Sequence, residues 1–169
     1  VWLLLLGSLA VSFLASIVLS VDSARDTFQT QLHIKNSDNA TLLAQVLSQQ
    51  EGDLGRVETL MRAQFDTGFY RELRLTSPDG ETIFLREAQQ APLHAPGWFS
   101  ALVPIDAGPG FAQISSGWRQ IGTLRVVSHS AYAHDHLWQG ALEAVATFAL
   151  VMGLATTCAA ALVRRIELP

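Results

Sequence analysis

YRELRLTSPDGETIFLR, residues 70–86, is the stretch that decides the fold. Residues 70–76 alternate polar and apolar side chains, which places the leucines on one face of an extended strand. Ser-Pro-Asp-Gly at 77–80 combines the residue types that favour a tight turn, and 82–86 then returns as a second extended run. The pattern predicts an antiparallel β-hairpin.

Further elements are predicted on both sides of this hairpin. Before it, Asp53 is a candidate N-cap for a short helix that ends near Phe65. After it, Trp98 and Phe99 begin a helical turn that Pro104 ends. Strands are expected at residues 111–115 and 120–128, and long helices at 22–50 and 129–143. This order of elements is typical of an α/β fold: a small PAS-like sensor domain in which helices cover an antiparallel sheet.

The two ends of the chain are apolar. Residues 1–21 and 144–163 contain no charged side chain, and each run is long enough to cross a bilayer as a helix. Paired arginines follow the second run, which favours the cytoplasm for that end. We therefore expect a transmembrane helix at 1–21, a periplasmic domain at 22–143, a second transmembrane helix at 144–163 and the start of a HAMP-like cytoplasmic relay at 164–169. A chain that begins at Val1 and stops at Pro169 is expected to be part of a longer, two-pass inner-membrane protein.

Composition and motifs argue against several functions. The net charge of −4 disfavours nucleic acid as a partner. The only cysteine, Cys158, lies in the second apolar run, so the central domain has neither a disulfide nor a thiol nucleophile. His129, His134 and His136 cluster with Asp135, but the spacing of the histidines on a helix prevents them from sharing a metal ion, and ordinary solvated histidines are favoured. We expect no enzymatic activity, no metal and no cofactor in this chain.

The helix expected at 22–50 has a narrow apolar stripe with a polar middle. Phe28, Leu32, Asn36 and Leu43 lie near this stripe. Such a helix packs either on its own domain or against the same helix of a second copy, with a polar residue setting the register. The second interpretation is favoured, because a helix that leaves a membrane has little domain to pack against. It predicts a homodimer with these four residues at the seam.

Trp118 is in an unusual place for a tryptophan, because it follows Gly117 in a predicted hairpin turn. Its neighbours are small or polar, so they offer the indole no apolar surface. A glycine with positive φ would project the next side chain outward. An aromatic ring held at a rigid tip is typical of an interface anchor. We therefore predict a partner-binding site at Gly117, Trp118 and Arg119.

FDTGFY at 65–70, the Gly-Trp tip, the VVSH run at 126–129 and RRIELP at 164–169, in this order, resemble the amino-terminal region of LapD-type receptors. The same region occurs in MoxY-like sensor kinases. The resemblance implies a receptor that binds cyclic di-GMP through degenerate GGDEF and EAL domains in the cytoplasm and passes the change through a HAMP relay. Its periplasmic domain, a domain-swapped dimer, then holds a LapG-like cysteine protease, so that a surface adhesin is retained and the biofilm stays attached. The tryptophan at the tip, here Trp118, would enter an apolar pocket of the protease.

Two alternatives remain at this stage. In one, the domain is an outside-in sensor of a small molecule, as part of a MoxY-like sensor kinase, a diguanylate cyclase or a phosphodiesterase. In the other, the chain is a passive anchor in the lipid of the inner membrane. A cavity with polar lining beneath residues 87–96 would favour the small-molecule sensor, whereas an exposed Trp118 would favour the protein receptor.

Overall fold

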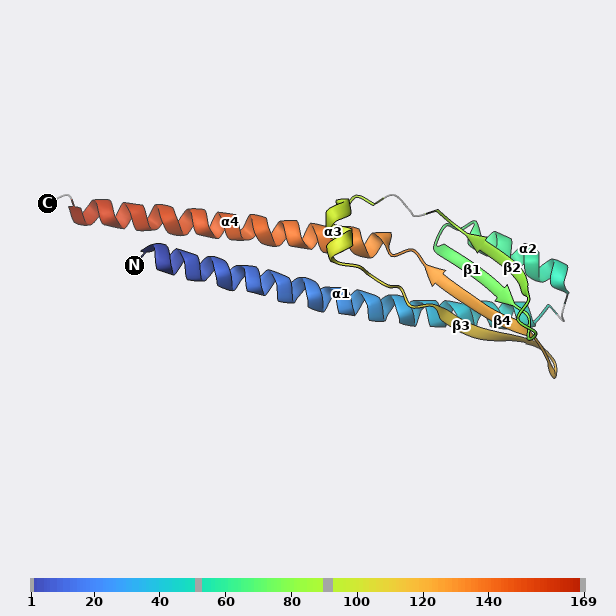
Figure 1. Cartoon of the computed structure of the whole chain (residues 1–169). Coiled ribbons are helices and arrows are strands. Elements are labelled where there is room, and N and C mark those ends of the chain that lie inside the picture. Colours follow the sequence, from blue (N-terminus) through green and yellow to red (C-terminus); the bar gives the residue numbers. More distant parts are fainter. Residues whose placement is uncertain (1, 51–52, 90–92, 168–169) are drawn as a thin grey trace. The chain divides into compact units, whose positions relative to one another are not determined.

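The structure is a computed structural model that describes residues 2–50, 53–89 and 93–167, with side chains described for 7–50, 53–89 and 93–158. Helices and strands follow one another as the sequence analysis expects (Figure 1). The helices are α1 (Trp2–Ser48), α2 (Leu54–Phe65), α3 (Gly97–Leu102) and α4 (Ala131–Glu167), and the strands are β1 (Tyr70–Thr76), β2 (Thr82–Glu87), β3 (Gly110–Ser116) and β4 (Arg119–Ser128).

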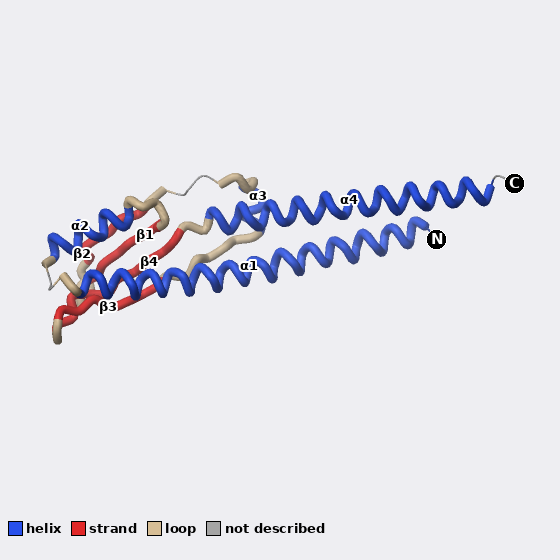
Figure 2. The backbone as a smooth tube through the Cα atoms, turned by 180° about the vertical axis from the view of Figure 1, so that it is seen from behind, coloured by secondary structure: helices blue, strands red, loops and turns tan. Residues whose placement is uncertain are grey.

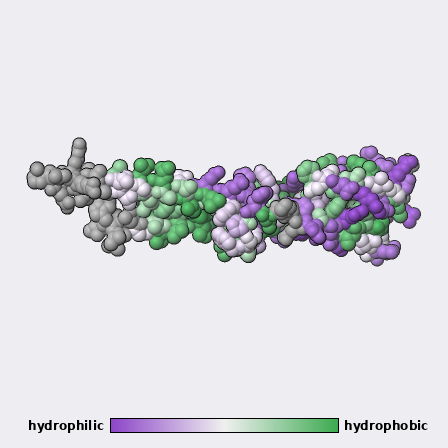
Figure 3. All heavy atoms as spheres, turned by 90° about the horizontal axis from the view of Figure 1, so that it is seen from above, coloured by the Kyte–Doolittle hydropathy of each residue, from purple (hydrophilic) through white to green (hydrophobic). Residues whose placement is uncertain are grey.

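The chain forms two compact units. The helical unit comprises residues 1–24 and 136–169. Within it, the ring of Phe13 on α1 stacks on that of Phe148 on α4, with centroids 3.7 Å apart and planes 8° from parallel. The described surface of this unit is largely apolar (Figure 3), and both helices are long and apolar enough to cross a membrane. The positions of the two transmembrane segments within these helices stay predictions.

The sheet unit, residues 25–135, contains an antiparallel sheet of four strands in the order β2-β1-β4-β3 (Figure 2). The hairpin predicted from residues 70–86 is confirmed as β1 and β2, and Gly80 at its turn has φ of 87°. The second hairpin is confirmed as β3 and β4. Because β1 pairs with β4, the two hairpins join through their inner strands.

The hydrophobic core lies on one face of this sheet. Leu73 and Leu75 of β1 are fully buried there, as the alternation of their strand requires. Helix α2 covers them with Val57 and Met61, and its predicted N-cap is confirmed, because Asp53 accepts hydrogen bonds from the backbone N–H groups of residues 55 and 56. The part of α1 within the sheet unit adds three residues at helical spacing, namely Ala40, Ala44 and Leu47.

The opposite face of the sheet carries charged side chains from neighbouring strands. Glu72 of β1 is almost fully buried and forms ion pairs with Arg125 of β4 and with Arg74 of its own strand. The distance from Arg74 Nε to Glu72 Oε1 is 3.1 Å. Arg74 also reaches Glu87 of β2, with 3.7 Å between Nη2 and Oε1. These groups connect β2, β1 and β4 electrostatically.

The middle of α1 lies very close to the backbone that leads into β3. A Cβ atom added to Gly110 would lie only 2.0 Å from the carbonyl oxygen of Asn36, so glycine is required at this point. At Gly108 an added Cβ would lie 2.9 Å from Nδ1 of His33. The Gly-Pro-Gly segment, residues 108–110, therefore allows a loop backbone to pack directly on a helix.

Helix α3 confirms the predicted helical turn but buries only part of its apolar surface. Phe99 and Val103 are buried, as expected for residues that hold the preceding loop to the domain. Trp98 and Leu102 are 61% and 74% exposed. A single helical turn presents one face to the domain, so its other apolar residues remain outside.

Candidate protein-binding site at the β3–β4 hairpin

The hairpin of β3 and β4 ends in a loop of two residues. Ser116 pairs with Arg119, and Gly117 and Trp118 connect them. Gly117 has φ of 58°, a conformation that residues with a Cβ atom adopt at a cost. The sequence therefore places glycine where the tight loop needs it, and tryptophan directly at the tip.

The base of this hairpin is fixed to the core. Ile114 of β3 is fully buried. The next residue, Ser115, donates its backbone N–H to the hydroxyl oxygen of Ser48 at 3.1 Å, and that hydroxyl donates to the carbonyl of Ala44 at 2.7 Å. The end of α1 is thus hydrogen-bonded to β3 immediately before the strand leaves the domain, which holds the hairpin in place.

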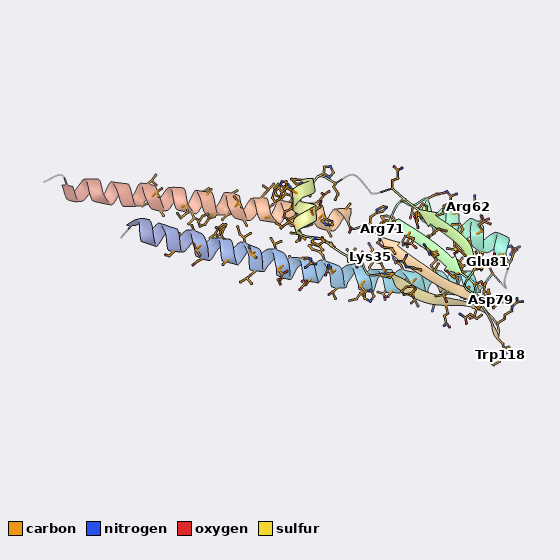
Figure 4. The ribbon with its side chains drawn as sticks, viewed as in Figure 1. Lys35, Arg62, Arg71, Asp79, Glu81 and Trp118 are labelled. Atoms are coloured by element: carbon orange, nitrogen blue, oxygen red, sulfur yellow. The ribbon has the colours of Figure 1, made fainter. Side chains whose placement is uncertain are left out.

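The indole of Trp118 has no contact surface within its own fold. Its relative exposure is 107%, so the folded chain covers none of it. Within the part of the chain whose side chains are described, Trp118 takes part in no hydrogen bond or ring contact. Figure 4 shows its side chain pointing away from the sheet. The prediction that this ring projects outward is confirmed.

Two acidic residues that the sequence analysis did not consider lie at the same end of the sheet. Asp79 and Glu81 belong to the turn between β1 and β2, and Figure 4 shows them near the end that carries Trp118. The pairing of Thr76 with Thr123 explains this, because it brings the end of β1 beside the start of β4. Arg119 is exposed beside the tryptophan. The hairpin tip therefore presents a large aromatic ring with charges of both signs nearby.

The predicted dimer seam needs a correction at Asn36. This side chain is fully buried in its own domain, where Nδ2 donates to the carbonyl of Gly108 at 2.8 Å and Oδ1 accepts from the N–H of Ser128 at 3.0 Å. It therefore cannot face a second copy. Leu43 packs partly against the core, and Phe28 and Leu32 are half-buried, so for these three the seam stays a prediction.

His134 differs from the expectation of solvated histidines, whereas His136 is exposed as expected. His134 is buried, and its Nδ1 lies 3.1 Å from the carbonyl oxygen of Ser130. Burial and the positive charge of Arg71 lower the pKa of His129. Among the residues that the structure describes, no three histidine, cysteine or acidic side chains are placed to hold a metal ion.

Asp135 connects the start of α4 to the loop before α3. Its Oδ1 accepts the backbone N–H groups of His94 and Ala95 at 2.9 and 2.8 Å, and its Oδ2 lies 2.9 Å from Nδ1 of His94. Burial alone would raise the pKa of Asp135, but these hydrogen bonds and the charge of His94 outweigh it and lower the pKa.

A small α/β domain that stands in the sequence between two candidate membrane helices is the arrangement of a receptor-type signalling domain. The family model of the LapD/MoxY periplasmic domain matches residues 17–138, and the chain belongs to this family. Among solved structures, the LapD periplasmic domain of Pseudomonas fluorescence is 35% identical in sequence, covers 73% of this chain and 98% of its own, and has a TM-score of 0.42. A search of curated proteins gave no match.

Membership has consequences for localisation and activity. The LapD-type periplasmic domain is a non-catalytic receptor domain. A periplasmic domain with a candidate membrane helix on each side is consistent with a protein of the inner membrane.

Proposed function

We propose that this chain is the receptor segment that captures a LapG-like periplasmic cysteine protease through Trp118. The single observation that carries the proposal is the complete exposure of this indole on a hairpin whose base is fixed to the core. A tryptophan has a large apolar surface that is favourably removed from water, and here only a partner offers a pocket for it. Membership in the LapD/MoxY family supports a protein partner of this kind.

Signalling in this proposal runs from the cytoplasm outward. Cyclic di-GMP bound to GGDEF and EAL domains outside this chain would act through a HAMP relay on α4, and a homodimer would select the arrangement that holds the protease. While the protease is held, it cannot release the surface adhesin, and the biofilm persists.

The test is a binding titration of a purified LapG-like protease with the full chain in lipid nanodiscs. Trp118→Ala and Trp118→Glu are compared with Trp98→Ala, which removes the exposed tryptophan of α3 and serves as the matched control. Loss of an anchor tryptophan costs about 2–4 kcal/mol, which corresponds to roughly 30- to 800-fold weaker binding. Trp98→Ala should bind as the parent does. Equal affinity of all variants, or a parent that does not bind the protease, would contradict the proposal.

A second candidate function is an outside-in sensor of a small molecule. The observation that favours it is a cavity in the sheet unit with several polar lining residues. Leu93, in the loop before α3, is also part of its lining. The two functions are compatible in one domain, because Trp118 at the hairpin tip is not among the residues that line this cavity.

A further inference from the structure

A cavity of about 290 Å³ lies in the sheet unit where the start of β1, the end of β4, α3 and the start of α4 meet. Its polar lining consists of Arg71, Ser100, His129, Ser130 and His134, and none of the described residues that line it is an aspartate or a glutamate. The volume is near the lower end of the range for small-molecule sites. A ligand that fits here is therefore small, and the lining presents it with positive charge and hydrogen-bond donors but no acidic group.

Arg71 is placed at this cavity by a β-bulge. Tyr70 pairs with Ser128 and Glu72 pairs with Val127, so Arg71 is the extra residue between two regular pairs of β1 and β4. A bulge turns a side chain away from the regular alternation of its strand, and bulges of this kind are frequent beside binding sites. Figure 4 shows Arg71 at the start of β1. Its guanidinium forms no ion pair with any side chain that the structure describes.

Two further features of the lining favour an anion. His134 is not one of them, because its Nδ1–H donates to the carbonyl oxygen of Ser130 at 3.1 Å. The lowered pKa of His129 keeps its ring neutral at neutral pH, with one N–H to donate. Ala131, also in the lining, is the first residue of α4, whose helix dipole adds to the preference for an anion.

Besides Ser100 of α3, the remaining lining is apolar, with Leu93, Ala101, Pro104 and Ile105 from the loop before α3, from α3 itself and from the segment after it. We propose that this cavity binds a short-chain monocarboxylate, with its carboxylate on Arg71 and its hydrocarbon part against these apolar residues. One arginine matches one carboxylate. An amino acid fits less well, because its ammonium group would find no acidic partner in the lining.

A carboxylate bound here would connect Arg71 of β1 to the junction of β4 and α4. Ser130 and Ala131 form this junction, and α4 continues as a candidate membrane span to Cys158. The ligand would thus stabilise the segment from which the second membrane helix starts. This inference is independent of the protease proposal, because it involves neither Trp118 nor any other residue of the β3–β4 loop.

The test is calorimetric titration of the full chain in nanodiscs with sodium butyrate at constant ionic strength. Butyramide has nearly the same shape without the charge, and inorganic phosphate is a second anion without a hydrocarbon part. We expect saturable binding of butyrate, and no binding of butyramide or phosphate. This comparison uses the parent protein and needs no variant.

Two arginine variants locate the site. Arg71→Met should weaken butyrate binding by roughly tenfold or more, because a charged donor to the carboxylate is lost. Arg86→Met removes an exposed arginine of β2 that does not line the cavity, and it should bind butyrate as the parent does. Absence of butyrate binding to the parent, equal binding of butyramide or phosphate, or full affinity in Arg71→Met would overturn the proposal.

Discussion

The side-chain oxygen of Asn36 accepts a hydrogen bond from the backbone N–H of Ser128 at 3.0 Å, across 92 positions of sequence. The amide nitrogen of the same side chain donates to the carbonyl of Gly108. One buried polar group therefore connects α1, the loop before β3 and the end of β4. Buried amides that satisfy backbone groups in this way favour one arrangement of the surrounding segments over others.

Asn36→Ala is expected to destabilise the sheet unit by about 2–4 kcal/mol. The variant leaves the N–H of Ser128 without a partner in a buried place and opens a small cavity. Thermal unfolding of the full chain in detergent micelles, followed by near-ultraviolet circular dichroism, measures the change. Asn39→Ala is the control, because Asn39 lies on the same helix and is only half-buried. Equal stability of the two variants would contradict the structural role of Asn36.

Gly110→Ala should destabilise the protein by about 3 kcal/mol or more, because the added Cβ would overlap the backbone of α1. The distance to the carbonyl oxygen of Asn36 would be 2.0 Å, and backbone cannot move aside as a flexible side chain can. Gly140→Ala in α4 meets no atom within 4 Å and should be neutral or stabilising by up to about 1 kcal/mol. The same unfolding measurement compares them, and a Gly110→Ala variant as stable as the parent would show that the close approach is absent.

Gly117→Ala is expected to lower stability, whereas Trp118→Ala is expected to lower protease binding and leave stability nearly unchanged. Alanine at position 117 must adopt φ of 58°, which costs about 1 kcal/mol. Removing the fully exposed ring of Trp118 should change stability by less than about 0.5 kcal/mol while it abolishes most of the protease binding. A marked loss of stability in Trp118→Ala would mean that the ring packs on its own domain.

Acid should weaken the contact between Asp135 and the loop before α3. The folded pKa of Asp135 is lowered from 3.8, so the unfolded chain takes up this proton first as the pH falls. The stability contributed by Asp135 is therefore fully present above pH 3.8 and is lost as the pH falls through the lower folded pKa. Asp135→Asn should be less stable than the parent at neutral pH, and the difference should shrink in this acidic window. Asp106→Asn, at an exposed position, is the control, and a loss of stability in Asp135→Asn no larger than in this control would contradict the role of Asp135.

Local patterns predicted most of the fold. Both hairpins and the N-cap Asp53 depend on neighbours within a few residues, and the structure has all of them. The exposure of Trp118 was predictable for the same reason, because the turn and its polar surroundings are contiguous in sequence. The role of that ring in binding a partner stays a prediction.

Contacts between segments far apart in the sequence could not be predicted from local patterns. The polar middle of α1 is equally consistent with a seam between two copies and with a buried connection inside one domain. Only the positions of Gly108 and Ser128 distinguish the two, and no periodicity in α1 reports them. The burial of His134 and the placement of Arg71 by a bulge likewise depend on how β1, β4 and α4 meet.

The hydrogen bonds of Asn36 can form only after most of the domain has been synthesised. The residues that complete them are synthesised long after α1, since Gly108 follows Asn36 by 72 positions and Ser128 by 92. During export, the apolar face of α1 is therefore exposed until β4, the last strand, has also been exported. Contacts between residues so far apart in sequence slow folding. In that interval α1 is accessible to β4 of a neighbouring chain as well as to its own β4. A high local concentration of newly exported chains would thus favour pairing of α1 with β4 of a neighbouring chain.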